Sequence, residues 1–414
     1  MPSVFWFIAI FSIAAAANAQ DCKLEVSSHS ETVMFSKADI EELTDGNIID
    51  APISTFRSGE KNIWVLPTAR QYNKASVKRL DISHRLTMGD VKNPREIDVG
   101  EFFQPEFMHI SDQATSGTRG YKWITNTYQT PAGVLGFVHA EYTAEDDHWH
   151  MACDPWTKDR KFCAPGNSKV GLAWMAASTA TSKQPYFTYL GHIAGFNADR
   201  LHFNVHGVPW FINTEEGVQY LNIVYHDVNV APGWGQITRA RSPLSEVLNM
   251  AKAGSTTRWE KYNNGVWEDA LTGNSSSILP VEPALQAIDP KIAKGQVIVH
   301  SDAVKHKETG RYFLSAYTLK IGSTVARPSR LVFYDSCDGA KWRFNTYTNG
   351  RTDGEWGWSY LTFVDDDGTD NGEASGTFNL IAGFDYGRPQ KHVEVMDVTV
   401  PESCNCPDRD DVSE

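Results

Sequence analysis

Short runs of alternating apolar and polar residues recur along the whole chain of 414 residues. A period of two is typical of β-strands, in which successive side chains point to opposite faces. One such run, GFVHAEYT from Gly136, places His139 and Glu141 two residues apart and therefore on one face. Only residues 36–42 and 242–253 carry the start and stop signals of short helices. The pattern predicts an all-β protein with little helix.

A hairpin pattern returns five times, each time as an extended segment, a turn and a strand rich in aromatic and β-branched residues. The hairpins begin at Asp50, Tyr121, Gly207, Gln296 and Trp358. No linker rich in Pro, Gly or Ser divides the chain, which favours one closed body. We therefore predict an all-β, five-bladed β-propeller over residues 20–406 and an acidic C-terminal tail, residues 407–414. Two β-sandwich domains are the alternative, because alternating strands alone do not distinguish these folds.

The N-terminal segment has the pattern of a secretory signal peptide. An apolar run extends from Val4 to Ala17 and leads into the small-x-small triplet Ala-Asn-Ala that ends at Ala19. We expect cleavage after residues 1–19, export, and a secreted, extracellular chain. No other segment approaches the ~20 apolar residues of a membrane span. In an exported protein Asn274, in Asn-Ser-Ser, is a glycosylation acceptor that we expect on a surface loop.

The charge balance limits the partners of the chain. The formal net charge is −13 and the sequence pI is about 5.5. Nucleic acids and anionic membrane surfaces both require a basic patch on the protein, so neither is an expected partner. A neutral or cationic ligand, or Ca²⁺, fits this charge better.

Six cysteines follow the expected signal peptide, and an even number in an oxidising compartment predicts disulfide bonds. They are Cys22, Cys153, Cys163, Cys337, Cys404 and Cys406. Cys153 and Cys163 are near enough in sequence to close one loop. Cys22 can pair with either tail cysteine, and Cys337 then pairs with the other or stays free. A ring of sheets needs a latch where its first and last blades meet, and a bond from Cys22 to the tail would supply it, because in the chain-entropy model a longer closed loop stabilises more.

Three carboxylates are candidates for chemistry. In a propeller the first strand of each blade lines the central channel, and polar side chains from several blades converge at one mouth. Asp50 stands at the start of the first hairpin, and Asp302 lies in the first strand of the fourth. An acid in an otherwise apolar inner strand is costly unless it is solvated, paired or used. Glu141, from the second hairpin, is the third candidate, and Asp112 and Asp227 are substitutes for it.

Seven stretches carry a resemblance to a known group of proteins. They are DAPISTFR from Asp50, HAEY from His139, KVGLAWMAAS from Lys169, ITRARSPLSEVL from Ile237, RWEKYNNGVWEDALTG from Arg258, HSDAV from His300 and SCDGAKW from Ser336. In this order they resemble the secreted five-bladed propeller proteins related to glycoside hydrolases, the group of arabinanases, β-xylosidases and invertases. The chain looks closest to a poorly characterised subset with Asp-x-Pro-x-x-x-Phe-Arg and His-x-Glu-Tyr motifs.

The resemblance implies a glycosidase that hydrolyses the bonds of an oligo- or polysaccharide with paired carboxylates. Asp50 would be the base or nucleophile, Asp302 would orient or tune it, and Glu141 would be the acid. The implied partner is a carbohydrate, and we expect a monomer. Candidate substrate-binding residues are Arg57, His139, Trp149, Trp234 and His300, with Trp156 and Trp356 as further stacking candidates.

Other interpretations of these residues stay open. Asp50 before Ala-Pro can stabilise a turn, and His139 and Glu141 can form a solvated strand face. Residues 365–373, DDDGTDNGE, raise Ca²⁺ as a cofactor, but they lack the Glu of an EF-hand, which favours a solvated acidic loop. Residues 146–153 have metal-ligand types without a zinc spacing, which favours a disulfide-tied surface loop. The alternative function is a secreted, non-catalytic propeller that binds glycans or matrix, because fold does not decide function.

Overall fold

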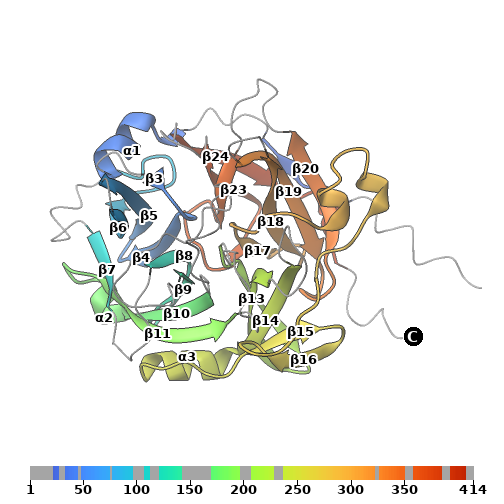
Figure 1. Cartoon of the computed structure of the whole chain (residues 1–414), viewed down its shortest axis with the longest axis horizontal. Coiled ribbons are helices and arrows are strands. Elements are labelled where there is room, and N and C mark those ends of the chain that lie inside the picture. Colours follow the sequence, from blue (N-terminus) through green and yellow to red (C-terminus); the bar gives the residue numbers. More distant parts are fainter. Residues whose placement is uncertain are drawn as a thin grey trace, which may run out of the picture.

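The computed structural model describes residues 22–27, 33–44, 48–74, 77–96, 107–111, 121–141, 169–195, 207–227, 236–321, 326–349, 358–384 and 392–406. Their strands form antiparallel blades around a central axis (Figure 1), which confirms the predicted all-β, five-bladed propeller. Blades 1 and 2 share one nine-stranded sheet, and blades 3, 4 and 5 are sheets of five strands each.

The strands of each blade follow one another along the chain. Blade 1 contains β3 (Ile48–Ile49), β4 (Ser54–Ser58), β5 (Lys61–Lys74) and β6 (Val77–Met88), and β7 (Phe107–Ser111) joins it to blade 2. Blade 2 contains β8 (Tyr121–Thr130), β9 (Gly133–Glu141), β10 (Lys169–Ala176) and β11 (Tyr186–Ala194). Blade 3 contains β12 (Trp210–Glu215), β13 (Val218–Asp227), β14 (Gln236–Pro243), β15 (Glu260–Asn263) and β16 (Val266–Asp269).

Blades 4 and 5 also take in strands from elsewhere in the chain. Blade 4 contains β17 (Ala303–His306), β18 (Tyr312–Ile321), β19 (Ala326–Ser336) and β20 (Arg343–Asn349), and β22 (Glu373–Ala374) pairs in parallel with β17. Blade 5 contains β21 (Trp358–Val364), β23 (Thr377–Phe384) and β24 (His392–Thr399). The N-terminal strands β1 (Glu25–Val26) and β2 (Val33–Phe35) complete it by pairing with β24.

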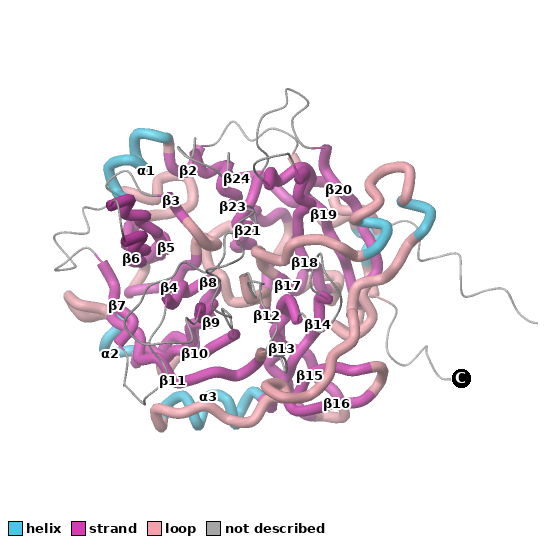
Figure 2. Tube along the Cα trace, in the orientation of Figure 1, coloured by secondary structure: helices cyan, strands magenta, loops and turns pink. Residues whose placement is uncertain are grey.

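The helices are short and lie on the outside of the ring (Figure 2). They are α1 (Lys37–Thr44), α2 (Ala177–Ala180) and α3 (Leu244–Lys252), with the 3₁₀ turns η3 (Pro283–Leu285), η4 (Ile292–Lys294) and η5 (Glu402–Cys404). The two helices predicted from the sequence correspond to α1 and α3. None of the helices in the described ranges is both long and apolar enough to cross a bilayer.

Five apolar clusters hold the blades together, one at each interface between neighbours. Between blades 1 and 2, for example, Phe56 and Val65 pack with Val138 and Phe187. The same arrangement recurs between blades 2 and 3, 3 and 4, 4 and 5, and 5 and 1. Each sheet is therefore apolar on both faces, which explains why inner segments such as VLGFV show little polar alternation.

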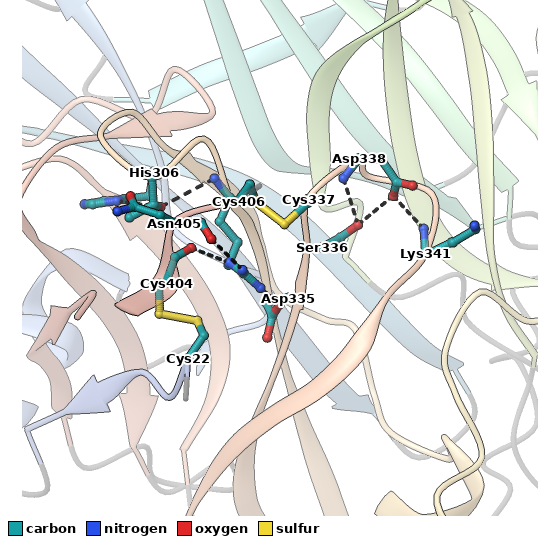
Figure 3. The surroundings of a disulfide bond; sticks show 12 residues. Cys22, His306, Asp335, Ser336, Cys337, Asp338, Lys341, Cys404, Asn405 and Cys406 are labelled. Carbon is teal, nitrogen blue, oxygen red and sulfur yellow. Dashed lines mark hydrogen bonds and ion pairs between the residues drawn. A yellow bond between two sulfur atoms is a disulfide. The ribbon is translucent and has the colours of Figure 1, made fainter. Parts of the chain in front are cut away.

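The ring closes where the N-terminal segment meets blades 4 and 5. Cys22 forms a disulfide with Cys404, and Cys337 forms one with Cys406, next to each other in Figure 3. The Asn345 side chain in β20 also binds the backbone of Leu24 and of Cys22. These bonds make the seam a covalent and hydrogen-bonded latch, as the cysteine positions predicted. Cys153 and Cys163 lie outside the described residues.

Candidate functional site

The inner strands of the blades run in one direction, so each mouth of the ring has a distinct set of side chains. Thr127 of β8 donates a hydrogen bond to the carbonyl of Thr55 in β4, and two residues later Gln129 bonds the backbone of Arg57. In β21, the backbone N–H of Leu361 bonds the carbonyl of His300, and two residues later that of Phe363 bonds Asp302, in the segment that leads into β17. On the other side of this segment, Gly207 before β12 lies against His300. We call the mouth where these strands begin the Asp50 mouth, and the mouth where they end the Lys305 mouth.

Asp50 lies in the short break between β3 and β4 at the Asp50 mouth. Its backbone N–H donates to the carbonyl of Pro67 at 2.9 Å, which fixes the main chain against β5. Its Oδ1 accepts a hydrogen bond of 3.0 Å from the hydroxyl of Tyr360 in β21. Asp50 is half-buried. The first and last blades thus hold this carboxylate between them.

Tyr360 reaches Asp50 because the backbone of β21 is distorted. Its φ is +55°, in the left-handed region that bulky residues rarely adopt, and pairing with β23 is interrupted between Ser359 and Thr362. The irregular turn lays the Tyr360 ring edge-on against His300, with centroids 4.5 Å apart. Strain of this kind persists only where the surrounding structure enforces it, and it concentrates at functional sites.

Blade 2 brings two further candidates to the Asp50 mouth. His139, 3% exposed, packs on Trp123 at 5.1 Å and on His300 at 6.2 Å between ring centroids. Because β9 is antiparallel to β8, its last residue, Glu141, pairs with Tyr121 at the start of the inner strand. The Glu141 backbone is therefore at this mouth, while its side chain lies outside the described part.

Asp302 is in the interior of the ring, below the Asp50 mouth. It is fully buried. Its Oδ1 accepts hydrogen bonds from the side chain of Asn126 at 3.0 Å and from its neighbour's backbone N–H, and its Oδ2 accepts one from the N–H of Phe363 at 3.1 Å. Burial raises its pKa from 3.8 to about 7 in spite of these bonds. This carboxyl is placed to position strands β8, β17 and β21, and it does not open onto the mouth.

Asp370 is a second buried acid beside Asp302, and the sequence analysis missed it. The loop before β22 returns this residue to the ring interior, where it is 4% exposed and neither carboxyl oxygen accepts a hydrogen bond of good geometry. Burial raises its pKa, and the charge of Asp302 raises it further, against a lowering by the N–H groups of Gly372 and Thr127. Nothing in DDDGTDNGE distinguishes Asp370 from its exposed neighbours, so the expected solvated loop is wrong at this position.

Arg57 is not brought to the Asp50 mouth. It lies near the end of β4, whereas Asp50 lies before the start of this strand. Its guanidinium pairs with the carboxylate of Asp367 at 3.3 Å. Asp227, named as a substitute acid, is buried in blade 3 and pairs with Lys261 at 2.8 Å. Asn274 is on an exposed loop, as predicted, and its glycosylation stays a prediction.

Several predicted residues lie outside the described residues: Asp112, Trp149, Trp156, Trp234 and Trp356. In the part of the chain that is described, no group of three or more His, Cys, Asp or Glu side chains is arranged to hold a metal ion. In the acidic loop, Asp367 pairs with Arg57 and Asp365 with Lys307 at 3.6 Å. Calcium binding stays a prediction.

No protein-family model and no curated protein sequence matches the chain. Solved structures of similar shape include a native arabinanase from Bacillus subtilis, 8% identical over 86% of this chain and 96% of that chain, with a TM-score of 0.36. A family 117 glycoside hydrolase from the marine bacterium Zobellia galactanivorans is 8% identical over 95% and 92%, with a TM-score of 0.38. A GH43_1 enzyme from Xanthomonas citri, complexed with xylotriose, is 9% identical over 89% and 90%, with a TM-score of 0.42. No functional conclusion follows from a likeness this distant.

Proposed function

We propose that the protein is a secreted glycoside hydrolase that cleaves a poly- or oligosaccharide at the Asp50 mouth. The observation that carries the proposal is the position of Asp50: a carboxylate at the mouth of a ring of sheets, oriented by the hydroxyl of a strained tyrosine from another blade. His139 and His300 pack around this pair. The strand that ends with Glu141 reaches the same mouth.

In this proposal Asp50 acts as base or nucleophile at the anomeric carbon, and Glu141 protonates the oxygen of the leaving group. As a base, Asp50 takes a proton from the attacking water; as a nucleophile, it forms a glycosyl ester that water then hydrolyses. Carboxyl groups ~5–5.5 Å apart give retention of configuration, and groups ~6.5–9.5 Å apart give inversion. Asp302 acts as a positioning residue, because it bonds β21 three residues after Tyr360. Two disulfides favour an oxidising compartment and thus support export.

Hydrolysis can be tested with the purified protein on a panel of aryl glycosides and neutral polysaccharides. We expect activity on at least one substrate, and a loss of about a thousandfold or more in Asp50→Asn and Glu141→Gln. Asp397→Asn, the same change at an exposed residue of β24, is the matched control and retains activity. Equal activity of Asp50→Asn and wild type would remove the proposed base. Proton NMR of the first product anomer separates retention from inversion.

A further inference from the structure

A pocket of about 380 Å³ opens at the Lys305 mouth, away from Asp50. It lies between blades 2, 3 and 4, where β8, β12 and β17 end, and the loop before β22 forms its remaining side. The rings of Tyr128, Trp210 and Tyr312 line it, together with Ile212 and the polar side chains of Lys305, Asn371 and Glu373. This volume is near the lower end of the roughly 300–1,000 Å³ of small-molecule pockets, and suits one or two sugar rings.

A buried layer separates this pocket from the Asp50 mouth. Asn126, Thr127 and Asp302 are all fully buried, and Asp370 is nearly so. They fill the ring interior between the starts and the ends of the inner strands. A ligand in the pocket therefore does not reach Asp50, and the two mouths are separate sites.

Aromatic side chains form the walls of the pocket, and contacts with neighbouring rings and backbone fix their positions. Trp210 stacks on Phe137 with centroids 5.6 Å apart, and Tyr128 lies against Trp210 at 4.7 Å. Tyr312 donates its hydroxyl hydrogen bond to the carbonyl of Ile212, which fixes its ring. Rigid aromatic faces of this kind bind the C–H face of a ligand at little entropic cost.

Polar side chains that form no ion pair or side-chain hydrogen bond with the described residues surround these aromatic walls. Lys305 and Glu373 are neighbours in the β17–β22 pairing, yet among the described residues neither forms an ion pair. The Lys305 ammonium lies 5.6 Å from the centroid of Tyr312. Asn371, which is exposed, has no hydrogen bond from its amide among the described residues. A cation, a carboxylate and an amide thus remain available to one ligand.

We propose that this pocket is a second carbohydrate site, which binds a neutral glycosyl unit. A sugar ring presents C–H groups to aromatic walls and hydroxyls that both donate to a carboxylate and accept from an ammonium. One group of each sign at the rim gives no net preference for a charged ligand, and the net charge of −13 disfavours an anionic polymer. The site goes beyond the proposed hydrolysis, because it holds the glycan at the mouth opposite to Asp50 and does not require cleavage.

The Ile212 methyl group lines the pocket and can report its occupancy by methyl NMR. The probes are the methyl β-glycosides of glucose, galactose, mannose, xylose and arabinose. We expect at least one to shift the Ile212 resonance in a saturable way, and Lys305→Met and Asn371→Ala to weaken this binding about tenfold each. Lys252→Met, at an exposed lysine that ends α3, is the control and binds as wild type does.

The same titration on Asp50→Asn separates this proposal from the proposed hydrolysis. We expect the Ile212 shift to be unchanged in that variant, whether or not the wild type cleaves any substrate. No Ile212 shift with any of the five glycosides would overturn the proposal. Binding by Lys305→Met as tight as by wild type, or tighter binding of glucuronate than of methyl glucoside, would do so as well.

Discussion

At the scale of single residues, the Asp50 mouth is defined by how one carboxylate is held. A hydrogen bond from a fixed donor holds a carboxylate in one orientation. Tyr360 supplies such a bond to Asp50 from a strained backbone position, which the contact with His300 and the break in β21 pairing maintain. The tyrosine hydroxyl therefore fixes the orientation of the carboxylate.

Replacing Tyr360 by Phe removes this donor and keeps the ring. We expect kcat/KM to fall about tenfold, as for the loss of one hydrogen bond to a charged group. Tyr186→Phe, at a tyrosine that is 46% exposed, is the control. A kcat/KM of Tyr360→Phe equal to that of wild type would show that Tyr360 does not act on Asp50.

The two interior acids, Asp302 and Asp370, make a prediction about stability and pH. Both have a raised pKa in the folded chain, and that of Asp302 is about 7 against 3.8. The folded state then binds more protons than the unfolded state between these values, so stability falls as pH rises from about 4 through 7. We expect a lower urea midpoint at pH 8 than at pH 5, and a smaller difference in Asp370→Asn, which removes one charge.

The control for this prediction lies in the same loop. Asp366 is exposed and near Asp370 in sequence, so Asp366→Asn should leave the difference between the two midpoints unchanged. Tryptophan fluorescence follows unfolding in all three proteins. A wild-type difference that Asp370→Asn does not reduce would mean that ionisation of the buried Asp370 does not lower the stability at high pH.

At the scale of elements, the hairpins could be predicted because their signals are local. The turns at Gly59, Gly217 and Gly310 have φ of +64°, +80° and +65°, which glycine adopts without strain. Each turn is flanked by strands whose pattern is legible within about twenty residues. The helix α3 has equally local signals. Five hairpins of this kind were enough to predict the number of blades.

Other elements could not be predicted because their partners are distant in sequence. Strand β2 pairs with β24, and β22 pairs with β17. The sequence around β2 and around β22 does not indicate which strand each of them pairs with. The bulge at Tyr360 and the burial of Asp370 have the same origin, since tertiary packing imposes both. Of the candidate site, the sequence analysis grouped Asp50, Glu141 and Asp302 with both histidines and Arg57, and gave no sign of Tyr360. The structure buries Asp302 below the mouth and places Arg57 away from it, while the catalytic roles stay predictions.

At the scale of the whole molecule, a propeller is closed only if its last blade is tied to its first. Here the tie has three parts. Strands β1 and β2 complete blade 5, Phe35 of β2 and Ile40 of α1 enter the core between blades 5 and 1, and Cys22 bonds to Cys404. Each of the five interfaces between blades is an apolar cluster between two neighbours only. Loss of one interface therefore opens the ring but leaves the other four packed.

The stabilisation by the Cys22–Cys404 disulfide can be compared with that by the Cys337–Cys406 disulfide. The Cys22–Cys404 bond spans 382 residues and the Cys337–Cys406 bond spans 69, and in the chain-entropy model the longer loop stabilises by about 1.5 kcal/mol more. We therefore expect the Cys22→Ser/Cys404→Ser variant to lose more free energy of unfolding in urea than Cys337→Ser/Cys406→Ser. Equal losses would contradict this difference in loop entropy. They would mean that β1 and β2 stay close to β24 in the unfolded chain even without the Cys22–Cys404 bond, so that the bond removes little further freedom.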